Sequence, residues 1–331
     1  MKRFKYLFFT LLLICFSIQL WAQTETLKWY TLKEAMELNK KQPRKILIDM
    51  YTSWCGWCKK MDAETFHNPS IEAFIRDNYY AVKFDAETYD TIEFKDKKYT
   101  HEGTGYRTPH SLAVMLMNNK MSYPTIVYLD ETLNPISAVP GYMNAADIEP
   151  VLIFFARNFY KIEPFENFKK DFEKTYKDTA NFKDKINWMT LKNGMKTGKK
   201  KIIFLTYPGC IETNIMFKTS LQHDTIAAYL NKHFTCIQFD VLTKDTVEFN
   251  GMKYSFNPKE NLVHQLAVAL TNGQLSFPEM IFINEQNQLT SAVPGYFPVK
   301  NMEMLLHFFN NETYKTTKWE DYIKQFKSNI Q

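Results

Sequence analysis

The stretch IDMYTSWCGWCKKM, residues 48–61, places two cysteines three positions apart at the junction of two predicted elements. The apolar run over residues 46–51 predicts a buried strand, and a helical pattern begins at the cysteines. Backbone N–H groups at the start of a helix stabilise an anion, so the thiol of Cys55 is expected to ionise more readily than a free thiol. We therefore expect Cys55 to be the attacking thiolate, and Cys58, one helical turn later, to resolve the mixed disulfide.

Two other uses of a Cys-x-x-Cys pair stay open at this point. The pair could be half of a zinc site, but closed structural zinc needs four ligands, and no second Cys-x-x-Cys or His-x-x-x-His follows. It could be a purely structural disulfide, although a bridge over so short a loop restrains the unfolded chain little. A redox-active pair needs no metal and no cofactor, and we expect neither.

Working outward from the cysteines, the predicted elements alternate between strands and helices, which indicates an α/β unit. A long polar excursion separates the second predicted strand from the rest of the unit. The expected elements are strands at 46–51, 81–85, 125–129 and 136–139, helices at 59–76 with an interruption near Asn68, at 110–116 and at 145–159, and a small hairpin within the excursion at 86–108.

The sequence then repeats itself. HSLAVML from His110 is matched by HQLAVAL from His264, and SAVPGY occurs at both Ser137 and Ser291. After Cys55 the separation between matching residues stays at 155 and then 154 residues, which indicates one duplicated domain with few gaps. Aromatic residues at helical spacing over 165–172 and 319–326 predict that an amphipathic helix closes each repeat.

These patterns divide the chain into three expected segments. Residues 1–22 carry a basic start and an apolar run over residues 7–14, which is typical of a signal peptide. Residues 23–178 would form the catalytic domain and residues 179–331 a degenerate second domain, with the boundary in a polar segment. We expect a periplasmic or secreted protein; because Leu20 fits the cleavage pattern poorly, a membrane anchor facing the periplasm is the alternative.

Charge and cysteine usage limit the classes of function. The net charge is +5, and three basic residues of the expected signal account for three of these charges, so the rest of the chain carries +2. So small a charge gives no case for nucleic-acid binding. The four cysteines after residue 22 are too few for a disulfide-stapled scaffold, whereas one close pair in an oxidising compartment fits a redox dithiol.

The stretch around the cysteines resembles the active-site segment of the thioredoxin superfamily. Trp54 precedes the first cysteine, Asp49 stands six residues before it, and Tyr123-Pro124-Thr125 is similar to the cis-proline strand start of that family. The resemblance covers nearly all of residues 29–160, and its branch is similar to that of the C-terminal domain of the bacterial transmembrane thiol–disulfide interchange reductase. It implies two tandem thioredoxin-like domains, each a central mixed sheet flanked by helices.

The resemblance also implies roles for individual residues. Asp49, a carboxyl in an apolar setting, would pass a proton to or from Cys58; the alternative is a hydrogen-bonded polar group at a strand end. A cis bond before Pro124 would turn the Tyr123 main chain toward the sulfurs to pair with an extended peptide, and the alternative is an ordinary turn proline. Two tryptophans either form a docking surface or pack over the sheet. The expected substrate-positioning residues are Trp54, Gly56, Trp57, Tyr123, Pro124 and Thr125.

The chain departs from typical thioredoxins in two places. Gly56 and Trp57 stand between the cysteines instead of Gly-Pro, and the excursion at 86–108 is longer than theirs. Both departures lie in segments that bear on the redox potential and on the choice of partner.

The second repeat lacks most of the expected chemistry. The 155-residue offset puts Cys210 opposite Cys55, Thr213 opposite Cys58 and Phe204 opposite Asp49, while Pro278 keeps the place of Pro124. Since an unresolved mixed disulfide turns over poorly, we expect a non-catalytic binding or structural unit. The alternative is a monothiol site in which the Thr213 hydroxyl supports a Cys210 thiolate. Cys236 is expected to be buried and unpaired, because its place along the sheet is too far from Cys210 for a bridge.

The leading hypothesis is an exported thiol–disulfide oxidoreductase that exchanges its dithiol with protein disulfides or dithiols and with a redox donor or acceptor protein. The alternative is a non-catalytic, peptide-binding or chaperone-like tandem in which the Cys55–Cys58 bridge is inert.

Overall fold

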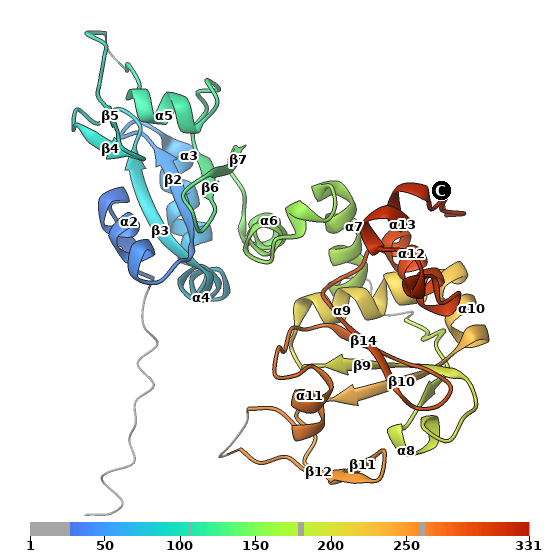
Figure 1. The fold of residues 1–331 in the computed structure, drawn as a ribbon. Coiled ribbons are helices and arrows are strands. Elements are labelled where there is room, and N and C mark those ends of the chain that lie inside the picture. The colour runs from blue at the N-terminus through green and yellow to red at the C-terminus, as the bar shows by residue number, and fades with distance from the viewer. Residues whose placement is uncertain (1–26, 106, 178–181, 259–261, 331) are drawn as a thin grey trace, which may run out of the picture. The chain divides into compact units, whose positions relative to one another are not determined.

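The computed structural model describes residues 27–105, 107–177, 182–258 and 262–330. The chain divides between Asn158 and Phe159 into two compact units, each with its own sheet (Figure 1). The expected signal peptide at 1–22 lies outside the described residues.

The first unit is built on a five-stranded mixed sheet. In the order β1-β3-β2-β6-β7, the first three strands pair in parallel, β6 is antiparallel to β2, and β7 is antiparallel to β6 and so runs in the same direction as the first three. Their bounds are β1 Trp29–Tyr30, β2 Lys45–Tyr51, β3 Tyr79–Asp85, β6 Thr125–Leu129 and β7 Pro135–Pro140. In β2 and β6, almost every residue is buried, which is what a central strand covered by helices on both faces requires.

Helices flank this sheet, and their ends follow from local sequence. A capping box between Thr31 and Glu34 starts the first helix, and the Asn68 side chain with Pro69 at the first helical position restarts the crossover after its interruption. The helices are α2 Leu32–Lys41, α3 Gly56–Met61, the π-helical turn η1 Asp62–Phe66, α4 Pro69–Asn78, α5 Ser111–Leu116 and α6 Ala145–Ala156. Apolar residues of α2 and α5 pack with the sheet in one core cluster.

The polar excursion of the first unit contains the expected hairpin, β4 Ile92–Phe94 paired with β5 Lys97–Tyr99. Lys95 and Asp96 at its tip both have positive φ, as a two-residue hairpin turn requires. Phe94 is buried in the core cluster, so the excursion is anchored to the unit.

The second unit repeats this topology. Its sheet has the order β14-β13-β9-β10-β8, the same as the first when read from the other edge, which confirms the duplication predicted from sequence. The strands are β8 Trp188–Met189, β9 Lys200–Thr206, β10 Phe234–Asp240, β13 Glu279–Ile283 and β14 Leu289–Pro294, with the hairpin β11 Val247–Phe249 and β12 Met252–Tyr254. The helices are α8 Leu191–Gly194, α9 Ile211–Lys218, η3 Ser220–Gln222, α10 Asp224–His233, α11 Gln265–Leu270, α12 Val299–Asn310, η4 Thr313–Lys315 and α13 Trp319–Gln325.

The division between the compact units differs from the boundary that we expected after residue 178. The turn η2 Phe159–Lys161 and the helix α7 Phe165–Tyr176 belong by their contacts to the second unit. The Phe159 ring meets Tyr296 at a centroid distance of 5.1 Å, and Lys218 Nζ donates to the Thr175 carbonyl at 3.0 Å. Sequence periodicity predicted the helix correctly, but only packing decides which core its apolar face covers.

Candidate active site

The two cysteines of the first unit form a disulfide at the start of α3. Cys55 is the N-cap of this helix, and its sulfur lies 1.99 Å from that of Cys58. The main-chain N–H of Cys58 donates to Cys55 Sγ at 3.0 Å. A helical N–H directed at this sulfur would stabilise a thiolate there in the reduced protein.

The carboxyl end of β2 and the beginning of β6 meet at one edge of the sheet. The register pairs Met50 with Thr125, so Cys55, just after β2, and Pro124, just before β6, lie at the same edge. The Tyr123–Pro124 peptide bond is cis, as the sequence comparison led us to expect. The main-chain N–H and C=O of Tyr123 have no hydrogen-bond partner among the described residues, whereas Thr125 is buried and donates to the Ser122 carbonyl.

Asp49 lies on β2 and is only 1% exposed. Its Oδ2 accepts from Lys83 Nζ at 2.7 Å, while its Oδ1 has no partner in the described part of the chain. Burial raises the pKa of this carboxyl, and the neighbouring ammonium of Lys83 opposes the rise only in part. Asp49 therefore gains and loses a proton closer to neutral pH than an exposed aspartate does.

Lys83 connects Asp49 to the end of the cysteine helix. Its ammonium also donates to Asp62 Oδ1 at 2.7 Å, and the Asp62 N–H donates to the Cys58 carbonyl. Burial by itself lowers the pKa of Lys83, but the two carboxylates outweigh it and the pKa is raised. Asp49, Lys83 and Asp62, here called the charged trio, thus form a continuous network that is hydrogen-bonded to the cysteine helix.

Sequence reasoning missed Lys83 and Asp62. The available signal was a lysine inside β3, a strand whose other residues are mostly buried. Such a lysine requires a partner, and the β2–β3 register places Asp49 directly beside it. Asp62 carried no comparable signal, because nothing in the spacing shows that the helix ends beside Lys83.

The aromatic side chains around the disulfide are exposed to solvent. Trp54 is 42% exposed and Trp57 is 59% exposed. The Trp54 ring meets Tyr123 edge-on at 5.9 Å, and the Trp57 ring lies 5.4 Å from Tyr142. Both indoles are thus at the surface instead of covering the sheet. Gly56 between them has open space around its α-carbon, so no neighbour there requires a glycine.

The equivalent place in the second unit keeps the backbone and loses the chemistry. Cys210 is the N-cap of α9, and the Phe277–Pro278 bond is cis. The Cys210 thiol donates to Glu212 Oε2 at 3.3 Å and to the Phe277 carbonyl at 3.6 Å. Burial raises the pKa of Cys210, and Glu212 adds to this while Thr213, itself buried, opposes it. Cys210 is therefore held as a neutral thiol at neutral pH.

The charged trio has been replaced as a set in the second unit. The offset places Phe204, Gln238 and Phe217 at the positions of Asp49, Lys83 and Asp62. The rings of Phe204 and Phe217 pack at 5.7 Å, and Trp188 packs against both. An aromatic cluster thus fills the space that the charges occupy in the first unit.

Cys236 is a free thiol buried within β10, as predicted. Burial raises its pKa to about 12.

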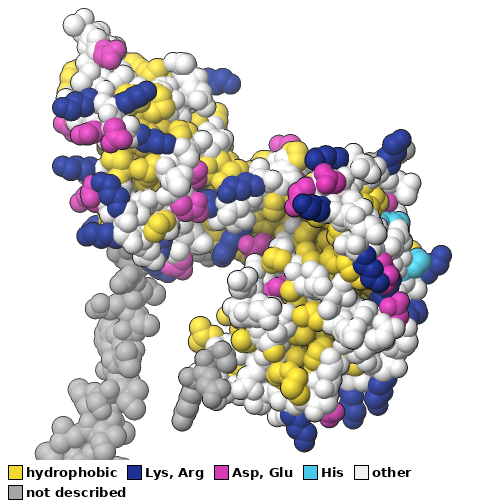
Figure 2. All heavy atoms as spheres, viewed as in Figure 1, with side chains coloured by type: hydrophobic (Ala, Val, Ile, Leu, Met, Phe, Trp, Pro, Cys, Tyr) yellow, Lys and Arg dark blue, Asp and Glu magenta, His cyan; other side chains and the backbone are white. Residues whose placement is uncertain are grey.

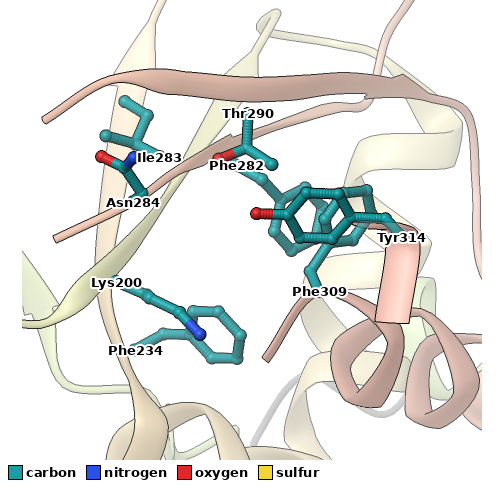
Figure 3. A pocket seen from close by; sticks show the side chains of 8 residues that line it. All are labelled: Lys200, Phe234, Phe282, Ile283, Asn284, Thr290, Phe309 and Tyr314. Carbon is teal, nitrogen blue, oxygen red and sulfur yellow. The ribbon is translucent and has the colours of Figure 1, made fainter. Parts of the chain in front are cut away.

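Elsewhere, the described residues offer little for a ligand. They contain no group of three or more side chains that could hold a metal ion. A cavity of about 10 Å³ in the second unit has room for about one water molecule; Figure 3 shows the rings of Phe309 and Tyr314 across from Lys200. A hollow of about 610 Å³ in the first unit lies at the amino ends of β2 and β3, away from the disulfide. It is lined by Leu27, Lys28, Tyr30, Arg44, Arg76, Tyr79 and Tyr80.

The visible surface carries charges of both signs. Figure 2 shows lysine and arginine side chains interspersed with aspartate and glutamate on the face in view. Among the described residues, no helix has the length and apolar character needed to cross a membrane.

The pattern of the thioredoxin-like domain family matches two regions, residues 32–156 and 189–310. The chain belongs to this family. The two matches coincide with the two sheets and confirm the expected tandem of thioredoxin-like domains, each a mixed sheet flanked by helices. Two thioredoxin-like domains, one with a Cys55–Cys58 disulfide, support an activity of the thiol–disulfide oxidoreductase kind.

Individual relatives are distant. An uncharacterized protein of Archaeoglobus fulgidus is 32% identical over 71 residues, which are 21% of this chain and 56% of the relative. One of Caenorhabditis elegans is 27% identical over 110 residues, 33% of this chain and 13% of the relative. The chain thus spans about half the length of the first curated relative and a small part of the second.

Solved structures with a similar fold include a DsbH oxidoreductase and the reduced C-terminal domain of DsbD from Neisseria meningitidis. The DsbH oxidoreductase is 16% identical, with a TM-score of 0.30 and coverage of 40% of this chain and 86% of that one. The DsbD domain is 18% identical with a TM-score of 0.27, and the match covers 38% of this chain and 93% of the DsbD domain.

Proposed function

We propose that this protein is an exported thiol–disulfide oxidoreductase that exchanges the Cys55/Cys58 pair with disulfides or dithiols of partner proteins. The observation that carries the proposal is the disulfide at the start of α3, at the same sheet edge as the unpaired main chain of Tyr123. This edge offers a reactive sulfur and a backbone to which an extended peptide can bind.

The exchange proceeds through a mixed disulfide. With the pair reduced, the Cys55 thiolate attacks one sulfur of a partner disulfide, the partner's S–S bond breaks, and a partner thiolate leaves. Cys58 then attacks the Cys55 sulfur, which forms the intramolecular disulfide and releases the second partner thiolate. Two electrons pass from the cysteine pair to the partner, and the reverse sequence oxidises a partner dithiol. The relative reduction potentials of the two pairs decide the direction.

Asp49 serves the second step as a proton acceptor. Cys58 must lose its proton before it attacks, and it lies in the interior of the unit, as Asp49 does. A buried carboxyl with a raised pKa is suited to take up that proton and to return it in the reverse reaction. Lys83 and Asp62 act as positioning residues, because they hold the carboxyl through the charged trio.

The partner would bind along the edge formed by Tyr123 and Pro124. The N–H and C=O of Tyr123, which have no partner in the described part of the chain, would pair with the backbone on either side of the partner cysteine. Trp54, Gly56 and Trp57 would contact its side chains, since both indoles are exposed. A second redox protein of this class would return the pair to its starting state.

The second unit would contribute binding or structure instead of chemistry. Its thiol is neutral and hydrogen-bonded, and a threonine stands in place of the resolving cysteine. A mixed disulfide formed at Cys210 would therefore have no resolving thiol. Export to the periplasm is part of the proposal and is supported by the targeting pattern of residues 1–22.

The test is the reduction of insulin by the full chain with dithiothreitol as reductant. Substitution of both active-site cysteines, Cys55→Ala with Cys58→Ala, should reduce the rate to that of dithiothreitol alone. The matched control, Cys210→Ala, should retain the wild-type rate. Equal activity of the double variant and the wild type would contradict the proposal and favour the chaperone-like alternative.

A further inference from the structure

Trp54, directly before the reactive Cys55, is held from two directions by the excursion at residues 86–108. Its indole Nε1 donates to both carboxylate oxygens of Glu87, each at 3.0 Å. The guanidinium of Arg107 lies over the ring at 4.2 Å from its centroid. Because Glu87 stands near the start of the excursion and Arg107 near its end, the segment closes on the ring from both ends.

The clamped ring stands next to the edge where a partner peptide would lie. The Trp54 and Tyr123 rings are nearly perpendicular with centroids 5.9 Å apart, and the main chain of Tyr123, just before the cis-proline, has no partner among the described residues. Trp54 nevertheless remains 42% exposed. The indole therefore forms a fixed apolar wall beside the backbone to which the peptide would bind.

The backbone at Arg107 is unusual. Its φ of 63° lies in the left-handed region, where a side chain is disfavoured and glycine is the usual residue. This conformation costs free energy for an arginine, and it places the side chain on the Trp54 ring.

The duplicated domain provides an internal comparison. The 155-residue offset places Gly209 opposite Trp54 and Leu242 opposite Glu87. The counterpart of Arg107 falls on Asn261 or Leu262, depending on where the one-residue gap lies, and neither is cationic. The tryptophan and both residues that hold it are thus absent together from the unit that lacks the cysteine pair, although the sheet and the cis-proline are kept. The fold itself does not need these three residues.

We propose that Arg107 is a specificity-determining residue: with Glu87, it fixes Trp54 as one wall of the partner site. The partner is an extended, cysteine-containing protein segment with an apolar or aromatic side chain next to its cysteine, which packs on the exposed part of the indole. This inference rests on the proposed exchange activity and adds a determinant for partner choice. Exchange with small disulfides does not depend on the Trp54 wall, because such substrates have no side chain that packs on the indole.

The experiment compares two substrates for the full chain, the protein substrate insulin and the small disulfide cystamine. In Arg107→Ala the loss of the cation–ring contact should lower kcat/KM for insulin about fivefold, mainly through KM. The cystamine rate and its pH profile should stay unchanged. Arg107→Lys keeps a cation over the ring and should recover much of the insulin rate. The control, Lys98→Ala, removes an exposed charge from the same excursion and should match the wild type for both substrates.

The outcomes separate this inference from the proposed function. An active wild type whose Arg107→Ala variant has an unaltered KM for insulin overturns the inference alone. Equal losses toward insulin and cystamine also overturn it, because Arg107 would then act on the thiol chemistry and not on the partner. Wild-type rates no higher than those of the double cysteine variant would instead contradict the exchange activity itself.

Discussion

At the scale of single residues, the environment of a side chain decides its chemistry more than its identity does. Cys55 and Cys210 both cap a helix that follows a buried strand. Cys55 is bonded to Cys58, whereas Cys210 faces a carboxylate and a carbonyl that hold it as a neutral thiol. Cys210 thus differs from Cys55 in two ways: it has no cysteine partner, and it faces Glu212. It therefore acts as a hydrogen-bond donor instead of as half of a redox pair.

Asp49→Asn tests the proton acceptor. Because burial raises the pKa of Asp49, the wild-type rate of insulin reduction should increase with pH through an ionisation above the ordinary aspartate value. The variant should lack this ionisation and be slower near neutral pH by a factor on the order of 10 to 100. The measurement is the pH profile of kcat. The exposed Asp77→Asn should leave the profile unchanged, and a persistent ionisation in Asp49→Asn would assign the step to another group.

At the scale of elements, β2, β3 and η1, the turn that directly follows α3, supply the charged groups next to the cysteine helix. In the first unit they bring together the charged trio of Asp49, Lys83 and Asp62. In the second unit the equivalent positions, on β9, β10 and α9, carry two phenylalanines and a glutamine. The two units thus show two solutions for one interior, one ionic and one aromatic.

Replacing the charged trio by its counterparts from the second unit is expected to keep the stability of the first unit while lowering its activity. Lys83→Gln alone leaves the buried Asp49 without its cation and should lower the free energy of unfolding by about 2 kcal/mol, since Lys83 is partly solvated. Adding Asp49→Phe and Asp62→Phe copies the second unit and should restore stability to about the wild-type value, because apolar replacement of a buried ion pair is often neutral. Urea unfolding measures both effects.

The triple variant should still lack efficient exchange, because the proton acceptor is gone. A triple variant less stable than Lys83→Gln would show that the aromatic interior does not fit the first unit. A triple variant with wild-type activity would show that the charged trio is not needed for the reaction.

At the scale of the whole molecule, the segment that follows the first sheet is bound to the second unit by buried acidic groups. Tyr296 donates to Asp171 on α7 at 3.2 Å, and Glu163 lies next to both, with one carboxylate oxygen buried and unpaired in the described part of the chain. Burial first, and then Asp171, raise the pKa of Glu163 to about 7, while Tyr296 opposes the rise. The pKa of Asp171 is also raised by burial, and the hydrogen bond from Tyr296 and then Lys174 oppose the rise.

The second unit should therefore lose stability as the pH rises. A carboxyl whose folded pKa lies above its unfolded value contributes its full stability at low pH, and this contribution is lost as the pH passes through about 7. Because Glu163 is only half-buried, solvent screening reduces the effect, and between pH 5.5 and 8 we expect the free energy of unfolding to fall by roughly 1 kcal/mol. Hydrogen exchange of residues 159–177 should become faster over the same interval.

The isosteric variant Glu163→Gln cannot ionise, so its stability should change less with pH and should exceed that of the wild type at pH 8. The control is Glu166→Gln, an exposed position in the first turn of α7. Parallel pH curves for Glu163→Gln and the wild type would remove Glu163 as the cause.

Local sequence patterns were sufficient to predict much of the secondary structure and the duplication of this protein. The strand before Cys55, the helix after it, the interruption at Asn68, the hairpin and the duplication were all predicted, because each depends on neighbouring residues or on a repeated pattern. The resemblance implied the cis bond before Pro124, and the repeat placed Pro278 at the equivalent position. The short strand β1 and the helix α2 were not among the elements predicted from the sequence.

Contacts between distant residues were decided only by tertiary structure. Lys83 reaches Asp49 and Asp62 because β2 and β3 pair in one particular register, and Arg107 reaches Trp54 because the excursion folds back over it. The helix α7 joins the second unit because its apolar face packs there. A sequence shows which side chains must find partners, since burial without one is costly, but the partner is selected by the path of the folded chain.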